Sequence, residues 1–125
     1  INTVSFGNEV TWNIQDGNGT VYASGGPYSS NFTDVVQVCL PDGTILTFNA
    51  IDSYGDGWNG GTYEVVCSNG NILANNGGNV PAGTGTSENF STIGCICPAP
   101  TGVSAVAETM NLYQMLFVIF FQKLV

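Results

Sequence analysis

Short alternations of apolar and polar residues dominate most of the chain. In "EVTWNIQ" at 9–15, Val10, Trp12 and Ile14 fall on one face of an extended strand. Turn signals, such as "DGNG" at 16–19 and "PDG" at 41–43, separate runs of this kind. The pattern predicts strands at 2–6, 9–15, 20–24, 32–40, 44–52, 62–67, 72–74 and 88–93.

Nothing before residue 103 has helical periodicity. Short strands joined by tight turns therefore predict an all-β fold, an antiparallel β-sandwich of the jelly-roll or Ig-like kind. A stretch rich in proline and glycine, "CICPAPTG" at 95–102, follows the last predicted core strand and indicates a boundary. We expect a sandwich domain at 1–97, a linker at 98–111 and a C-terminal strand at 112–125.

The C-terminal segment carries a nearly continuous apolar run, "LYQMLFVIFF" at 112–121. It is too short for a membrane-spanning helix, which needs about 20 residues, so no membrane span is expected. The run is also too apolar to leave in water. It either packs back on its own domain or completes the sheet of a neighbouring copy as a donated strand; a truncated domain is a third possibility.

Strand donation would connect copies head to tail and build a homopolymeric filament. The linker at 98–111 spans roughly 45 Å when extended at about 3.3 Å per residue, so reach is no obstacle. The residues expected at this self-assembly contact are Leu112, Tyr113, Leu116, Phe117, Val118, Ile119, Phe120 and Phe121.

Composition removes several function classes. Lys123 is the one basic residue, histidine is absent, and the formal net charge is -8. Nucleic-acid binding needs Lys or Arg against the phosphates, so it is excluded, and anionic membranes are disfavoured for the same reason. Without histidine the commonest general base is missing, and no enzyme is expected. The abundant oxygen donors are instead the ligands of hard cations such as Ca²⁺.

The four cysteines are Cys39, Cys67, Cys95 and Cys97. An even count in a chain poor in lysine indicates disulfides formed in an oxidising compartment. A bridge between Cys95 and Cys97 would be strained, so one of these two is expected to pair with Cys39 and the other with Cys67. The sequence leaves open which pairing holds, and free buried thiols are the alternative.

Other features point to an extracellular location. The sequence starts at Ile1 with neither Met nor a signal peptide, as expected of a processed, secreted product. Asn18, Asn31 and Asn89 each begin an N-glycosylation tripeptide at a predicted turn or strand end. Such tripeptides are common by chance, so the secreted assignment depends on them together with the cysteines.

Two stretches resemble a known family: "NEVTWNIQDGNGTVYASGGPY" at 8–28 and "CLPDGTILTFNAIDSYGDGWNGGTYEVV" at 39–66. They are similar to the extracellular β-domain of secreted bacterial and algal surface proteins. The resemblance covers about residues 1–95 and implies a non-enzymatic module used in adhesion or cell-surface assembly. "CPAPTGVSA" at 97–105 is similar to the opening strand of the fibronectin type III domains that often follow, but residues 106–125 depart from that pattern.

The segment "DSYGDGWNGG" at 52–61 is the strongest candidate site. Asp52 and Asp56 stand four apart, as at the start of an EF-hand loop, but Tyr54 and Tyr63 occupy positions where that loop needs ligands. We therefore expect a different calcium loop, to which Glu9 of the first resembling stretch adds a ligand from another strand. The expected ligands are Asp52, Asp56, Glu9, Asn59 and the backbone oxygens near Tyr54 and Trp58.

Three other interpretations of the segment stay open. The aspartates could accept backbone N–H bonds in a rigid loop without metal. Tyr54, Trp58 and Tyr28 could form an exposed platform for sugars. Asp52 with Asp56 or Glu9 could form a glycosidase-like pair, which the short loop and the absence of a tuning cation disfavour.

Together these features predict a structural subunit of an extracellular filament or surface assembly, stabilised by calcium and disulfides and polymerising by strand donation. The alternative is a monomeric carbohydrate-binding or adhesion module of a larger secreted protein.

Overall fold

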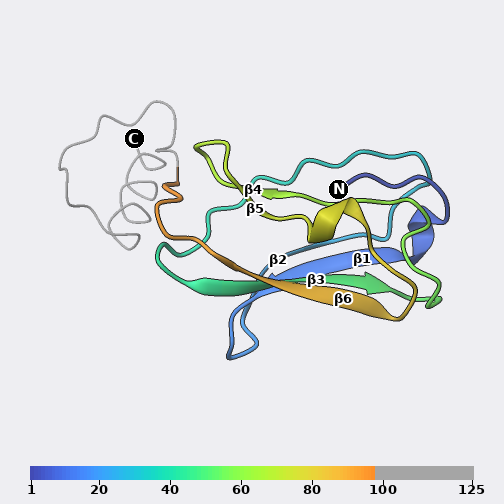
Figure 1. The fold of residues 1–125 in the computed structure, drawn as a ribbon, viewed down its shortest axis with the longest axis horizontal. Coiled ribbons are helices and arrows are strands. Elements are labelled where there is room, and N and C mark those ends of the chain that lie inside the picture. The colour runs from blue at the N-terminus through green and yellow to red at the C-terminus, as the bar shows by residue number, and fades with distance from the viewer. Residues whose placement is uncertain (98–125) are drawn as a thin grey trace, which may run out of the picture.

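The computed structural model describes residues 1–97, which form two layers of extended chain with no α-helix among them (Figure 1). One layer is a four-stranded antiparallel sheet with the order β2-β1-β3-β6. The other contains the short antiparallel pair β4-β5 together with extended segments. The predicted all-β, antiparallel sandwich is therefore confirmed. The strands are β1 (Val10–Gln15), β2 (Val21–Gly25), β3 (Ile45–Asp52), β4 (Val65–Val66), β5 (Ile72–Ala74) and β6 (Gly85–Ser91), and the two 3₁₀ turns are η1 (Gly7–Glu9) and η2 (Asn76–Gly78).

The alternation in β1 and β3 sets which face is buried. Val10, Trp12 and Ile14 of β1 are buried, as predicted. On β3 the buried residues are the even-numbered ones, from Leu46 to Asp52. The opposite face carries polar contacts, including the bond from Asn49 Nδ2 to Asn13 Oδ1 (2.7 Å). Alternation of this kind is typical of an antiparallel sheet with one solvated face.

Aromatic rings join the two layers. The ring of Tyr63, from the upper layer, stacks on Phe48 of β3 with centroids 4.1 Å apart and meets Trp58 edge-on at 5.9 Å. Trp12 of β1 also stacks on Phe48, with ring centroids 5.6 Å apart. Aromatic contacts of these kinds add to the free energy of area burial, so this cluster fixes the layers against each other.

Two of the predicted strands are wrong. Residues 2–6 and 32–40 contain no strand, only isolated bridges that Asn2 makes with Thr33 and with Thr62. A strand pattern reports an extended chain, but a strand also needs a hydrogen-bonded neighbour along its length. Val35 in the second segment is 81% exposed. The strands predicted at 62–67 and 88–93 are also shifted, to Val65–Val66 and Gly85–Ser91.

Both disulfides close the end of the sandwich away from Glu9. The bridges are Cys39–Cys97 and Cys67–Cys95, with Cα atoms 5.4 and 5.3 Å apart. The expectation that Cys95 and Cys97 separate to different partners is confirmed. None of the four is a free thiol.

The predicted linker at 98–111 and C-terminal strand at 112–125 lie outside the described residues. Within residues 1–97, no helix is long and apolar enough to cross a lipid bilayer.

Candidate metal centre

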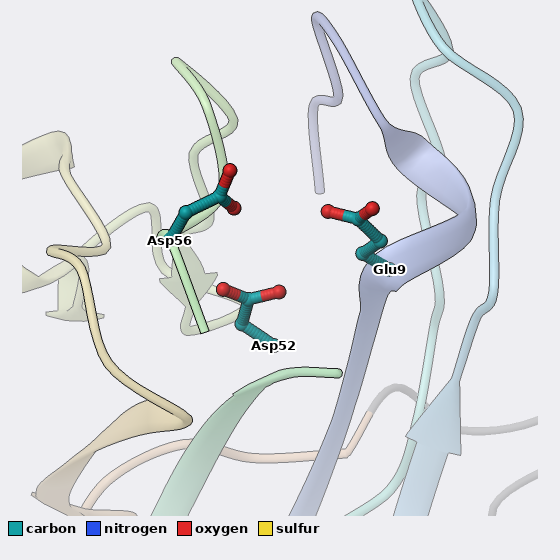
Figure 2. A group of neighbouring side chains, drawn as sticks. All are labelled: Glu9, Asp52 and Asp56. Atoms are coloured by element: carbon teal, nitrogen blue, oxygen red, sulfur yellow. The ribbon is translucent and has the colours of Figure 1, made fainter. Parts of the chain in front are cut away.

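Three carboxylates converge at one end of the sandwich (Figure 2). Glu9 ends η1 just before β1, Asp52 is the last residue of β3, and Asp56 lies in the loop that follows. One oxygen from each carboxylate lies within 4.8 Å of the other two. The structure thus brings together the three acidic residues that the sequence proposed as metal ligands.

Strand register explains why Glu9 lies beside the loop. In the antiparallel pair β1–β3, Val10 is opposite Asp52. The preceding residue, Glu9, therefore lies opposite Ser53, and its carbonyl oxygen accepts the N–H of Ser53 at 3.1 Å. Two segments more than forty residues apart in the sequence are fixed together at the point where their carboxylates meet.

Asp52 organises the loop. Its side chain is 2% exposed and accepts three backbone N–H bonds, from Tyr54 (3.1 Å), Gly55 (2.9 Å) and Gly57 (2.7 Å). Hydrogen bonds to a carboxylate are roughly twice as strong as those between neutral groups. This is the backbone-capping role considered for the aspartates. One oxygen of the same carboxylate also lies within 4.8 Å of an oxygen of Glu9 and of Asp56.

A third segment, residues 80–84, holds the loop from the other side. Trp58 N–H bonds to the carbonyl of Val80 (3.3 Å), Gly83 N–H to that of Gly55 (3.0 Å), and Asp52 N–H to that of Thr84 (3.0 Å). Gly57 has φ +91°, and a Cβ there would lie 2.8 Å from the Val80 oxygen, so only glycine fits. Sequence reasoning did not identify this support, because no motif or spacing connects 80–84 to the loop.

Glu9 is the member of the cluster that lacks a partner. Its Oε2 atom is buried and makes no hydrogen bond among the described residues. Burial raises the pKa of the Glu9 carboxyl, and the nearby carboxylates of Asp56 and Asp52 raise it further. A raised carboxyl pKa means that the ionised form is destabilised in the fold, and a bound cation would remove that destabilisation.

The donor set fits Ca²⁺. Calcium binds carboxylate and carbonyl oxygens at about 2.3–2.6 Å, so one ion reaches oxygens on opposite sides of a site about 5 Å across. The three oxygens here satisfy that spacing, and an unpartnered buried oxygen is the group that an ion would coordinate. Soft metals that prefer thiolates are a poor match, because the described cysteines are all in disulfides.

The other residues expected as ligands, Asn59, Trp58 and Tyr54, make hydrogen bonds within the loop. The Asn59 side chain donates to Asp56 Oδ1 (2.9 Å) and to the Gly57 carbonyl (3.2 Å), so it orients Asp56. The carbonyl of Trp58 accepts the Gly61 N–H at 2.7 Å. Tyr54 contributes its N–H to Asp52, as described above. A direct role in metal binding for Asn59, Tyr54 or Trp58 stays a prediction.

The exposed aromatic platform considered as an alternative does not form from Tyr54, Trp58 and Tyr28. Trp58 is 1% exposed, with its indole N–H bonded to the Ile51 carbonyl (3.0 Å), and it belongs to the core. Tyr28 is half-buried, and its hydroxyl accepts from Trp12 Nε1 (2.7 Å) and donates to Asp34 (2.9 Å). Tyr54 is exposed, but one ring is not a platform.

The three candidate glycosylation sites are all exposed. Asn18 lies in the turn between β1 and β2, Asn31 lies in a loop at φ 54°, and Asn89 lies on β6. Exposure is what a glycan needs, and occupancy of these sites stays a prediction.

Comparison of the chain with protein-family models, with curated proteins and with solved structures gave no match. The resemblance drawn from the motifs is therefore a hypothesis, and the function has to be argued from the fold and the site.

Proposed function

We propose that the protein is a calcium-stabilised structural subunit of an extracellular assembly, and that it polymerises by donating its C-terminal strand to a neighbouring copy. The calcium part is supported by the cluster of Glu9, Asp52 and Asp56, with its unpartnered buried oxygen. An ion there would connect the start of β1, the end of β3 and the loop after it. Its role would be to make one end of the sandwich rigid, not to catalyse a reaction.

The incomplete strand pairing of the upper layer is the main observation that supports polymerisation by strand donation. The lower sheet pairs four strands along their length, with one register shift in the β1–β2 ladder, whereas the upper layer has one short ladder, β4-β5, and isolated bridges. Val35, Val36 and Val38 are exposed there to 81%, 45% and 40%. Exposed, unpaired and apolar edges associate with other strands unless they are covered, and an apolar strand from another copy would cover this one.

Two disulfides support an oxidising, extracellular location. They also suit a subunit that must withstand mechanical and proteolytic stress outside the cell. The low content of charged residues, 8%, is consistent with a surface that contacts other copies and does not remain fully solvated.

Deletion of residues 108–125 tests the polymerisation. Because the donated strand is removed and the described residues are all kept, we expect the variant to lose polymers while the remaining chain keeps its β-sheet circular dichroism. Negative-stain microscopy and sedimentation of the full chain and the variant measure this. A milder variant, Ile119→Asp, places a charge in the middle of the apolar run and should act like the deletion.

A matched control is Ala105→Asp, which adds the same charge in the segment before the apolar run and should leave polymers intact. Polymers that persist at the wild-type level in the deletion variant would show that the C-terminal segment does not connect the copies.

A further inference from the structure

The acceptor of the donated strand can be located from the hydrogen bonds of the upper layer. Ile1 exchanges two backbone bonds with Asp34: its N-terminal amine donates to the Asp34 carbonyl (3.0 Å), and Asp34 N–H donates to the Ile1 carbonyl (2.9 Å). Past Asp34, no main-chain group of residues 35–39 makes a hydrogen bond to any other described residue. In Figure 1 this segment runs along the top of the upper layer.

On their other side, the N-terminal residues pair with the segment that contains Thr62, and this pairing also ends near Ile1. Asn2 and Thr62 exchange two backbone bonds of 2.8 Å each, in an antiparallel bridge. In Figure 1 the N-terminus lies between the top segment and the segment leading to β4. Among the described residues, this pairing ends at Ile1 on both sides, and residues 35–39 and 64–66 continue beyond it. We call these two segments the acceptor edges.

Main-chain groups of the acceptor edges point toward the position that a strand continuing the N-terminal residues past Ile1 would occupy. Along an antiparallel strand, alternate residues direct their N–H and C=O to the same neighbour. Since Asp34 bonds to Ile1, the next N–H and C=O groups that point toward this position belong to Val36 and Val38. Since Thr62 bonds to Asn2, the next such groups on the opposite side belong to Glu64. A strand placed there would find partners along both of its edges.

The side chains indicate an apolar occupant with a basic end. Val36, Val38 and Val66 are exposed to 45%, 40% and 51%. The acidic residues Asp34 and Glu64 flank them. Residues 112–121 carry no charge, and Lys123, the one basic residue of the chain, follows two positions after the run. An apolar strand with a cation at its end matches both features.

The path of the chain also favours this occupant. Cys97, the last described residue, is bonded to Cys39 at the end of one acceptor edge. Cys97, after which the chain continues toward residues 112–121, is therefore held beside the acceptor edge. Residues 98–111 can extend by roughly 45 Å at about 3.3 Å per residue, which is enough to reach the same edge on an adjacent copy.

We propose that residues 112–121 of a neighbouring copy pair as a β-strand between the acceptor edges, residues 35–39 and 64–66, on the continuation of the N-terminal residues. This inference rests on the proposed function and assigns the partner surface that it needs. Lys123 of the donor then lies near an acidic residue that borders the edges, Asp34 or Glu64.

Photo-crosslinking of the full chain tests the pairing. A benzophenone amino acid at Val36 is expected to crosslink to a peptide within residues 112–123, and a mixture of isotopically light and heavy chains is expected to show that the two peptides come from different copies. The same amino acid at Val21, which is 53% exposed on the edge strand β2, is the control and should not reach that peptide.

The outcomes separate the two proposals. Crosslinks from position 36 to the C-terminal run within one copy would overturn strand exchange between copies and with it the proposed function. Polymers that form normally while position 36 gives no crosslink to residues 112–123 would overturn the acceptor edges and leave the proposed function standing.

Proline substitution provides a second measurement on the full chain. Val36→Pro removes an N–H that faces the proposed strand, whereas Val35→Pro removes one that faces away from it. Because neither N–H has a partner among the described residues, both variants should fold with the wild-type melting temperature. We expect Val36→Pro to raise the critical concentration for polymerisation roughly tenfold, the equivalent of one hydrogen bond, and Val35→Pro to leave it unchanged. Equal critical concentrations in the two variants would contradict the pairing of the Val36 N–H with the donated strand.

Discussion

Replacing Asp52 with alanine should destabilise the protein by about 4 kcal/mol even in a calcium-free buffer. The carboxylate is buried and accepts three backbone N–H bonds within five residues, and one of the donors, Gly57 N–H, is itself buried. Alanine leaves all three donors without an acceptor, and water does not replace the carboxylate without opening the loop. A loss of this size is unusual for one substitution and is diagnostic of a broken hydrogen-bond network.

Asp56→Ala is the matched control, because Asp56 belongs to the same loop but is exposed, and among the described residues its carboxylate accepts a hydrogen bond only from the side chain of Asn59. In urea unfolding with a chelator present, we expect Asp56→Ala to lie close to wild type and Asp52→Ala far below it. With calcium present, both variants should lose the stabilisation by the ion. Equal stabilities of the two variants in chelator would contradict the structural role of Asp52.

Removing the Cys39–Cys97 bridge should cost about 4 kcal/mol, from the loop-closure entropy of a 58-residue separation. The bridge has a local role as well. Residues 35–39 make no main-chain hydrogen bonds to the rest of the described chain, so Cys39 is a principal attachment of that segment. Cys39→Ser with Cys97→Ser should therefore expose this segment to proteases as well as lower the free energy of unfolding.

The second disulfide provides a comparison for the loss of stability. Cys67–Cys95 closes a 28-residue separation, and its removal should cost slightly less, about 3.5 kcal/mol. Urea unfolding measures both losses, and limited proteolysis under native conditions locates the cleavage sites. Cleavage at 35–39 in the Cys67/Cys95 variant but not in the Cys39/Cys97 variant would contradict the local role.

The strands with one buried face could be predicted from the sequence. Apolar residues at alternate positions of 9–15 and 44–52 placed β1 and β3 within one residue of their observed bounds. The separation of Cys95 and Cys97 to different partners followed from the strain of a bridge between near neighbours, and the grouping of Glu9 with Asp52 and Asp56 followed from a motif resemblance.

Pairing between strands could not be predicted from the same pattern. Residues 32–40 are as apolar as a core strand, yet Val35 is largely exposed, because alternation says nothing about which neighbour supplies the hydrogen bonds. Trp58 illustrates a second limit. The pattern around Trp58 fits an exposed ring as well as a packed one and does not decide between them. In the structure the loop folds inward and buries Trp58 against Tyr63. The contacts from Gly83 and Thr84 to the loop depend on the tertiary fold and have no local sequence signal.

Thermal unfolding of the full chain and of Glu9→Gln, each with calcium and with a chelator, tests the calcium site most directly. Glutamine keeps the size of the side chain and removes its charge. In chelator, Glu9→Gln should be at least as stable as wild type, because the destabilised charge beside Asp52 and Asp56 is gone.

Calcium should reverse that order. At a hundredfold excess over Kd, the ion stabilises the wild type by about 2.7 kcal/mol, a rise in Tm of about 10 °C for a domain of this size. Glu9→Gln, with one ligand charge fewer, should gain much less. A wild-type Tm that is the same in calcium and in chelator would contradict the account.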